Sequence, residues 1–297
     1  MGQKAGEKWT AEAASQPTIP KSDRLLGHTA GPMPPRIHVD TPLSAGILLA
    51  LPANAARHVQ VLRLQPGAAL TLFDGHAGEW SAEVVEMARK TVTAQVLVHR
   101  AIERELATPV TLALGMPANE RMDGLVEKAT ELGVAAVQPL VCERSVLRVA
   151  GERAERKAAH WQAIAVAACE QSGRNRVPAV GLATSFREWL AAQAVGPAAT
   201  TRLVLSLDAD ARGLLDTLAD LRAELRAAAR AAVQPPGGSV HPPVLVLSGP
   251  EGGLGPAERA AARAAGFLPV TLGARVLRAD TAPLALLAIV AALEKPA

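Results

Sequence analysis

A regular alternation of strand-like and helix-like segments after Pro109 places the strongest constraint on the fold of this chain. Short apolar runs typical of buried strands lie at 110–115, 135–141, 203–207, 244–247 and 269–272. Between them, apolar residues recur at helical spacing, as in Met122, Leu125, Val126, Ala129 and Leu132. Because helices placed between strands usually connect parallel strands, the pattern predicts an α/β domain with a mostly parallel sheet.

The expected helices of this region have end signals of their own. Gly133 and Gly266 stand where glycine usually follows a helix, and Pro256 stands at a first helical turn. Asp280 is expected to open the last helix. An Ala/Arg/Leu-rich helix is expected at 213–232, followed by a Pro/Gly-rich surface insertion at 231–243.

Residues 36–100 have a different pattern, in which short strands follow one another. Strands are expected at 69–73, 79–85 and 91–98, with a turn at Asp74-Gly75 and a short helix at 54–64. In the last strand Val92, Ala94, Val96 and Val98 alternate with polar neighbours, which is the period of a half-buried strand. We therefore expect a disordered extension at 1–34, a small β-barrel at 35–104 and the α/β domain at 105–297.

The composition limits how the chain can bind a partner. It has 3 Phe, 4 Trp and no Tyr, so any RNA would be bound mainly by arginine and backbone groups rather than by aromatic stacking. The net charge is only +3, but basic residues outnumber acids from Arg144 to Arg176, and no acid lies between Arg259 and Arg278. Such patches suit a phosphate-bearing partner, although each could also be an ordinary solvated face.

Further signals indicate a cytoplasmic protein. Cys142 and Cys169 match no metal-site spacing, and we expect them to be reduced and buried. No signal peptide is recognised, and the longest apolar run, 282–293, is shorter than the roughly 20 residues that span a bilayer. Neither a metal nor a membrane is therefore expected.

Three segments could carry chemistry. A buried strand runs into Ser248-Gly249-Pro250-Glu251-Gly252-Gly253, where glycines would let a ligand approach the backbone closely. Neither the dinucleotide fingerprint nor the P-loop pattern is present, so the segment is either another kind of ligand loop or a tight strand–helix turn. The second segment, 272–282, contains Arg275 and Arg278, which could grip a phosphate or simply form surface ion pairs.

The third segment, 168–178, ends a helix in the polar sequence Glu-Gln-Ser-Gly-Arg-Asn-Arg at 170–176. It could be a functional loop or an ordinary helix end terminated by Gly173. In this order the three segments resemble the ribosomal RNA small-subunit methyltransferase E (RsmE) family of the SPOUT superfamily. Leu72-Phe73-Asp74-Gly75, residues 127–134 and residues 54–64 fit that family as well, and the resemblance covers roughly residues 36–294.

This resemblance implies a PUA-like barrel that binds RNA, followed by an α/β domain with a trefoil knot, and a homodimer. It implies that S-adenosylmethionine serves as cofactor to methylate N3 of uridine 1498 in 16S ribosomal RNA of the small subunit. The cofactor would be bound by Leu205, Leu247, Gly249, Pro250, Glu251, Gly252, Leu272, Gly273, Val276 and Leu277.

The resemblance and the basic patches together predict the residues that would face RNA, namely Arg144, Gln171, Arg174, Asn175, Arg176 and Arg278. Arg278 or Arg174 would stabilise negative charge on the uracil, and Glu170 is the candidate proton acceptor. One departure from the family pattern is Ala279-Asp280-Thr281, where Thr-Glu-Thr is usual. It shortens the acid by one methylene and puts a specific role for positions 279 and 280 in doubt.

Three other interpretations stay open. The chain could be a SPOUT methyltransferase that acts on another RNA site, such as a ribose of transfer RNA. It could be a non-catalytic RNA-binding protein of ribosome assembly, which the altered 279–280 pair permits and the glycine loop disfavours. A nucleotide-dependent oxidoreductase is disfavoured because the dinucleotide fingerprint is missing.

Overall fold

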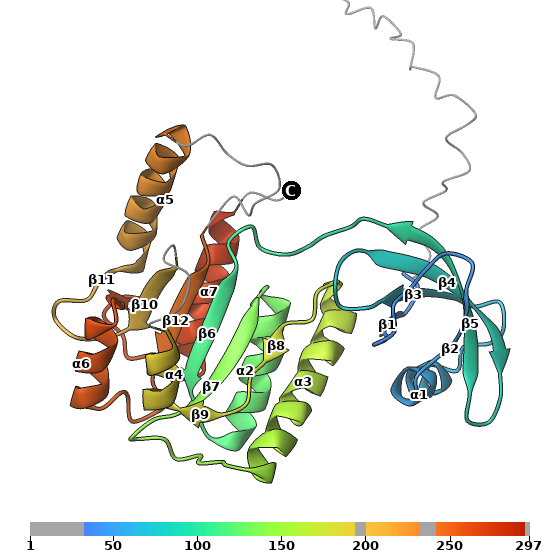
Figure 1. Cartoon of the computed structure of the whole chain (residues 1–297), viewed down its shortest axis with the longest axis horizontal. Helices are drawn as coiled ribbons and strands as arrows, with labels where there is room; N and C mark the ends of the chain where they lie inside the picture. Colours follow the sequence, from blue (N-terminus) through green and yellow to red (C-terminus); the bar gives the residue numbers. More distant parts are fainter. Residues whose placement is uncertain (1–32, 194–199, 232–241, 295–297) are drawn as a thin grey trace, which may run out of the picture. The chain divides into compact units, whose positions relative to one another are not determined.

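The computed structural model describes residues 33–193, 200–231 and 242–294 (Figure 1). Nearly all of the expected N-terminal extension and residues 232–241 of the expected insertion lie outside this description. The described chain contains two sheets, the first ending at Arg100 and the second beginning at Val110. No helix among the described residues is both long and apolar enough to cross a membrane.

The first sheet is built from residues 36–100 and has the strand order β1-β3-β4-β5-β2. Its strands are β1 (Arg36–His38), β2 (Leu48–Ala50), β3 (Ala69–Phe73), β4 (Glu79–Met87) and β5 (Val92–Arg100). Among the described strands of this sheet, β1 pairs with β3 in parallel, and the other neighbours pair antiparallel. Helix α1 (Ala53–Val61) adds Ala55, Ala56 and Val59 to the core of this sheet.

The alternation in β5 decides which side chains enter that core. Val92, Ala94 and Val96 are completely buried, as the period-two pattern predicts. Val98 was expected to continue the buried series but is 62% exposed. The strand runs on to Arg100, past the last residue that the small core can cover.

The second sheet has the strand order β11-β13-β10-β12-β6-β7-β8, with β9 also paired to β7, and all its pairings are parallel. Its strands are β6 (Val110–Gly115), β7 (Ala136–Val141), β8 (Ala179–Val180), β9 (Thr184–Ser185), β10 (Thr201–Leu205), β11 (Arg212–Gly213), β12 (Val244–Ser248) and β13 (Leu268–Thr271). The predicted parallel α/β sheet is confirmed.

Helices cover both faces of this sheet (Figure 1). They are α2 (Asn119–Glu131), α3 (Glu152–Ser172), α4 (Phe186–Gln193), α5 (Leu214–Ala231), α6 (Pro256–Ala264) and α7 (Thr281–Leu293). Leu112 and Val246 point to the face that packs on α2, α3 and α7, whereas Ala113 and Leu247 point to the face on α4 and α6. Burial on both faces explains why these strands are continuous apolar runs.

The predicted helix ends are found where the sequence places them. Gly133 and Gly266 follow α2 and α6 with φ of +93° and +82°, a region that favours glycine. Asp280 precedes α7 but makes no capping hydrogen bond through its side chain. Because strand pairing does not describe the threading of the chain, the trefoil knot stays a prediction.

Candidate cofactor site

A cavity of about 530 Å³ lies at the carboxyl ends of β10, β12 and β13. In parallel α/β sheets ligands commonly bind at this edge, because the loops that follow neighbouring strands meet there. Predicted residues that line it are Leu205, Gly249, Pro250, Glu251, Gly252, Leu272, Val276, Leu277 and Arg278. Leu247 is instead buried in the core below, and Gly273 lies outside the lining with φ +109°.

Glycine at position 249 is required by the close return of its own loop. A Cβ there would lie 2.9 Å from the backbone nitrogen of Leu254 and 3.1 Å from the carbonyl carbon of Gly253. On the neighbouring strand, a Cβ on Gly115 would lie 2.5 Å from Cδ of Pro250. The loop after β12 is thus folded tightly on itself and on β6, which leaves its backbone as the wall of the cavity.

Glu251 and Arg144 connect this loop to its neighbours. Oε1 of Glu251 accepts a hydrogen bond from the backbone N–H of Ala118 at 2.9 Å, just before α2. Nη1 of Arg144 donates to the carbonyl oxygen of Gly252 at 3.0 Å. Glu251 therefore lines the cavity but uses its carboxylate to position the loop, and Arg144, which was expected to bind RNA, supports the loop from the other side.

Charged side chains surround the mouth of the cavity. Asp208 is held by Arg263 at 3.1 Å and Arg259 at 3.8 Å. Arg275 and Arg278 are exposed lining residues, and neither guanidinium forms an ion pair with any residue in the described ranges. These two arginines are therefore available to an anionic ligand or to RNA.

The other predicted site residues lie at the opposite edge of the sheet. The 170–176 segment leads into the amino end of β8, where Ala179 pairs with Ala136 at the amino end of β7. The cavity lies at the other edge of the sheet, where the carboxyl ends of β10, β12 and β13 meet. Within one chain, the structure therefore does not bring Glu170, Gln171, Arg174, Asn175 or Arg176 together with the cavity. Gln171 is exposed, and Arg176 is an exposed residue that forms an ion pair with Glu103.

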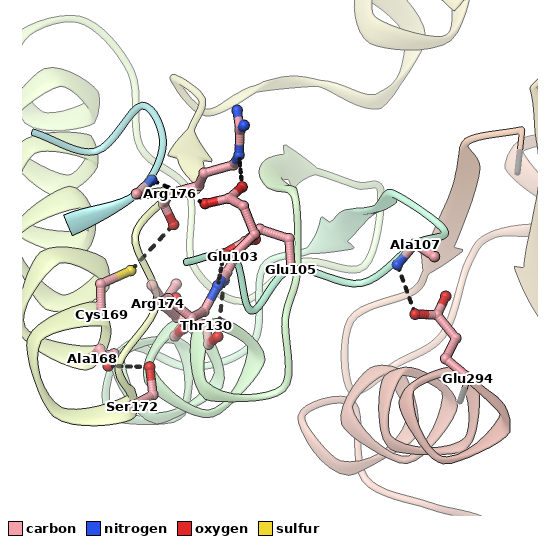
Figure 2. A network of polar contacts seen from close by, with 12 residues as sticks. Glu103, Glu105, Ala107, Thr130, Ala168, Cys169, Ser172, Arg174, Arg176 and Glu294 are labelled. Carbon is pink, nitrogen blue, oxygen red and sulfur yellow. Dashed lines mark hydrogen bonds and ion pairs between the residues drawn. The ribbon is translucent and has the colours of Figure 1, made fainter. Parts of the chain in front are cut away.

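The expectation that Arg174 and Asn175 face RNA is not met by their surroundings. Arg174 is only 3% exposed, with its guanidinium bound to Glu105 and to the carbonyl oxygen of Thr130 (Figure 2). Asn175 is completely buried. Their polar atoms are already used inside the chain, so neither can contact a base without breaking these bonds.

Glu170 is also engaged, which argues against its expected role as proton acceptor in this chain's own cavity. Oε1 accepts a hydrogen bond from the backbone N–H of His38 at 2.9 Å, and Oε2 lies 3.3 Å from Nδ1 of His58. The carboxylate therefore connects α3 to the first sheet and its helix α1, residues 36–100, which together we call the barrel.

Several lining residues were not found from the sequence. Asp208 directly follows the strand predicted at 203–207, and a carboxylate at a strand end could have indicated a residue of the ligand site. Arg121 lies at the start of α2, which follows β6, and Arg259 lies at the start of α6, which follows β12. Only the folded chain shows that both residues line the cavity.

Comparison with known proteins gives this geometry a family. Residues 104–291 match the RNA methyltransferase domain, and residues 51–97 match the RNA methyltransferase PUA domain. A ribosomal RNA small subunit methyltransferase E from Synechocystis is 35% identical over 234 residues, which cover 79% of this chain and 69% of the relative. This chain belongs to the ribosomal RNA small subunit methyltransferase E family. It is an RNA methyltransferase with a PUA-like sheet before a parallel α/β domain.

Two solved structures support the family assignment. A methyltransferase E from Neisseria gonorrhoeae, bound to S-adenosylmethionine, has a TM-score of 0.72 and 34% identity, covering 88% of this chain and 98% of that one. A putative methyltransferase from Legionella pneumophila, also with S-adenosylmethionine bound, has a TM-score of 0.74 and 31% identity, covering 87% and 97%. Family members of this fold thus bind the methyl donor that the sequence predicts.

Proposed function

We propose that this protein transfers a methyl group from S-adenosylmethionine to N3 of a uridine in 16S ribosomal RNA, at uridine 1498. The observation that carries the proposal is the cavity at the carboxyl ends of β10, β12 and β13, lined by most of the residues expected to bind the cofactor. The family supports methylation of small-subunit ribosomal RNA. The position and atom come from the resemblance of the sequence motifs.

The cavity fits the proposed cofactor. Its volume of about 530 Å³ is in the range of roughly 300–1,000 Å³ that small-molecule sites occupy. Backbone groups around Gly249 and Gly252 would bind the polar edges of the adenine and of the amino-acid part. Leu205, Leu272 and Leu277 supply the apolar wall against the ring.

S-adenosylmethionine supplies an already activated methyl group, so the protein must mainly position the base and manage its charge. Arg278, exposed at the cavity, would donate to a uracil oxygen as negative charge develops there. Asp208 and Glu251, the carboxylates of the described lining, are both held by other groups. We therefore expect the N3 proton to leave to water rather than to a carboxylate of the cavity.

The resemblance also implies a homodimer acting in the cytoplasm on small-subunit ribosomal RNA. Two exposed apolar side chains at the cavity support burial of this surface by a second subunit, since Val276 is 81% exposed and Leu207 is 59% exposed. Apolar groups gathered at a site mouth are commonly covered by a partner. Sedimentation of the purified protein tests this part of the proposal.

The decisive experiment is mass mapping of 16S ribosomal RNA from a strain that lacks the gene, with and without the wild-type protein restored. We expect loss of one methyl group on uridine 1498 and its return on restoration. A missing methyl group elsewhere, for example on a transfer RNA ribose, would show a different substrate. Failure of the purified protein to bind S-adenosylmethionine in calorimetry would favour the non-catalytic assembly protein.

A further inference from the structure

The polar segment Glu170–Arg176 is used by the chain itself. Two of its side chains, Arg174 and Asn175, are buried, and its hydrogen bonds reach three other parts of the chain. They are the first sheet, Thr130 of α2, and the connection between the two sheets, residues 101–109, which we call the strap. A segment that resembles a binding loop by composition is thus an internal junction.

Arg36, the first residue of β1, connects the barrel to this segment. Its Nη2 donates to the carbonyl oxygen of Arg174 at 3.1 Å and to Oδ1 of Asn175 at 2.6 Å, while Nη1 donates to Glu79 at 2.5 Å. The guanidinium also lies over the ring of Phe73, 5.0 Å from its centroid. One arginine therefore joins three strands of the barrel to the α/β domain.

The strap is fixed from the same segment. Nδ2 of Asn175 donates to the carbonyl oxygen of Ile102 at 2.6 Å. Arg174 forms a two-pronged ion pair with Glu105, and Arg104 donates both to Glu79 and to the carbonyl oxygen of Gly173 at 2.8 Å (Figure 2 shows the Arg174 contacts). The Arg174–Glu105 pair is largely shielded from water, with side chains 4% and 19% exposed, so it is stronger and more directional than a surface pair, whereas Arg104 is 42% exposed.

A second contact line lies at the end of α3. Glu170 accepts the backbone N–H of His38 and lies beside His58 of α1, and the backbone N–H of Val177 donates to Gly75 at 3.3 Å. A Cβ on Gly75 would lie 3.2–3.3 Å from His38 and Val177, so the barrel turn fits closely against this segment. The contacts involve β1, α1 and the β3–β4 turn, which together restrain rotation of the barrel.

We propose that Arg36, Arg174 and Asn175, with Glu105 of the strap, form a joint that holds the PUA-like barrel in one orientation to the methyl-transfer site. These residues act as positioning residues for the RNA and do not bind the reacting base. The inference rests on the proposed RNA methylation. An RNA that contacts both domains binds most tightly when the orientation of the barrel is already fixed. If the barrel could rotate, it would be in the orientation that binds RNA for only part of the time, and the apparent affinity would fall by that fraction.

The test uses Arg36→Ala and Asn175→Ala in the full-length protein, with Glu103→Gln as the matched control. Glu103 lies on the same strap, but its pair with Arg176 is exposed, with side chains 39% and 52% exposed. Its Oε1 also accepts the backbone N–H of Gly78 at 3.2 Å, and glutamine keeps an oxygen that can accept this bond. Each variant is assayed for S-adenosylmethionine affinity, for kcat and KM with 16S ribosomal RNA, and for the distribution of distances between spin labels on β4 and α2.

We expect both alanine variants to broaden the label distances and raise KM for RNA, with kcat at saturating RNA and cofactor affinity within about twofold of wild type. A correct orientation populated about a tenth of the time would raise KM about tenfold. The double variant should be little worse than either single one, because both remove the same contact. Glu103→Gln should behave like wild type.

The outcomes separate the joint from the proposed function. A fall in kcat without a change in KM or in label distances would mean that Asn175 acts on the base, and the joint proposal would be wrong. Unchanged distances and kinetics in both alanine variants would also overturn it. Should wild type itself leave 16S ribosomal RNA unmethylated, the proposed function fails, while the label distances still test the joint. If Asn175→Ala does not fold, Arg36→Ala, which leaves the α/β domain unaltered, decides the question.

Discussion

The carboxylate of Glu251 accepts a hydrogen bond from the backbone N–H of Ala118 at 2.9 Å, although the two residues belong to loops that follow different strands. The same carboxylate lies 3.8 Å from Arg121, which is in the first turn of α2. The glycine loop of the cavity is therefore held by a side chain that reaches the start of a helix, where a negative charge is favoured.

Removing that anchor should weaken cofactor binding. For Glu251→Ala we expect S-adenosylmethionine affinity to fall about tenfold, since one hydrogen bond to a charged group contributes roughly 1.5 kcal/mol. Glu251→Gln keeps an acceptor oxygen and should recover most of the loss in calorimetry. The control is Glu120→Gln, which changes an exposed residue of α2, the helix that Glu251 contacts. Equal affinities for all three variants would show that the loop holds its shape without Glu251.

Adding a methyl group at Gly249 should be far more harmful than adding one at Gly124. Its Cβ would meet backbone atoms at 2.9–3.1 Å, so the loop must move, at an expected cost of about 1–3 kcal/mol of stability. Gly124 lies in helix α2 with open space around it, so Gly124→Ala should stabilise by about 0.5–1 kcal/mol. Urea unfolding measures both, and destabilisation by Gly124→Ala would contradict the geometry.

Arg278→Ala should lower methyl transfer without unfolding the protein. The side chain is exposed at the cavity and pairs with no described residue, so its loss affects ligands rather than the fold. Removal of one donor that stabilises developing charge typically costs about 10²-fold in kcat, and we expect that order here. Single-turnover methylation of ribosomal RNA, with Arg89→Ala in the barrel as control, measures it. An unchanged rate with intact RNA binding would rule out this role for Arg278.

Neither cysteine should react in the folded protein. Burial raises the pKa of the Cys142 and Cys169 thiols to about 12. At pH 8 only about one thiol in ten thousand would be ionised, and the thiolate is the reactive form. Ellman's reagent should detect both thiols after unfolding in guanidinium and neither before. Rapid labelling of the native protein would show that one of them is accessible.

Stability should depend on pH through Glu79, which forms an ion pair with Arg36 of the joint. Burial raises its pKa, but hydrogen bonds and charges of Arg36 and Arg104 outweigh burial and leave the pKa below the usual 4.5. A carboxyl with a lowered pKa in the folded state stabilises fully above its unfolded pKa, and the stabilisation is lost as pH falls through the folded value.

Glu79→Gln should therefore cost about 3 kcal/mol at pH 7, as expected when one partner of a buried pair is removed. As pH falls through the lowered pKa of Glu79 in the folded protein, the unfolding free energy of the variant should approach that of wild type. Glu83→Gln, an exposed change on the same strand, should show neither effect. If the free energies of unfolding of Glu79→Gln and wild type differed by the same amount from pH 3 to pH 7, the charge-based explanation would be contradicted.

The long elements could be predicted because their signals are local. The apolar stripe of α2 and the runs of β6 and β12 follow from spacing alone, and Gly133 and Gly266 locate helix ends. Strands β8 and β9 were not predicted because they have two residues each. They exist through pairing with β7, where Val137 meets Val180 and Leu140 meets Thr184, which no local pattern reveals.

The site was predictable for a similar reason, and the joint was not. The glycine loop has an unusual local composition that indicates a close backbone approach. The sequence Arg174-Asn175 looks the same whether it binds RNA or the strap. The strap partners lie far away in the chain, Glu105 being 69 residues before Arg174 and Ile102 being 73 residues before Asn175. Only the fold shows that the acids of the strap meet these polar groups first.

Glu294, directly after α7, also binds the strap. Oε2 and Oε1 of Glu294 accept hydrogen bonds from the backbone N–H groups of Ala107 and Thr108 at 2.7 and 2.8 Å (Figure 2 shows the first). Deleting residues from 294 onward would take the acceptor from two amides of the connecting peptide. Purification tags and fusion partners are thus better attached through a spacer that leaves this carboxylate in place.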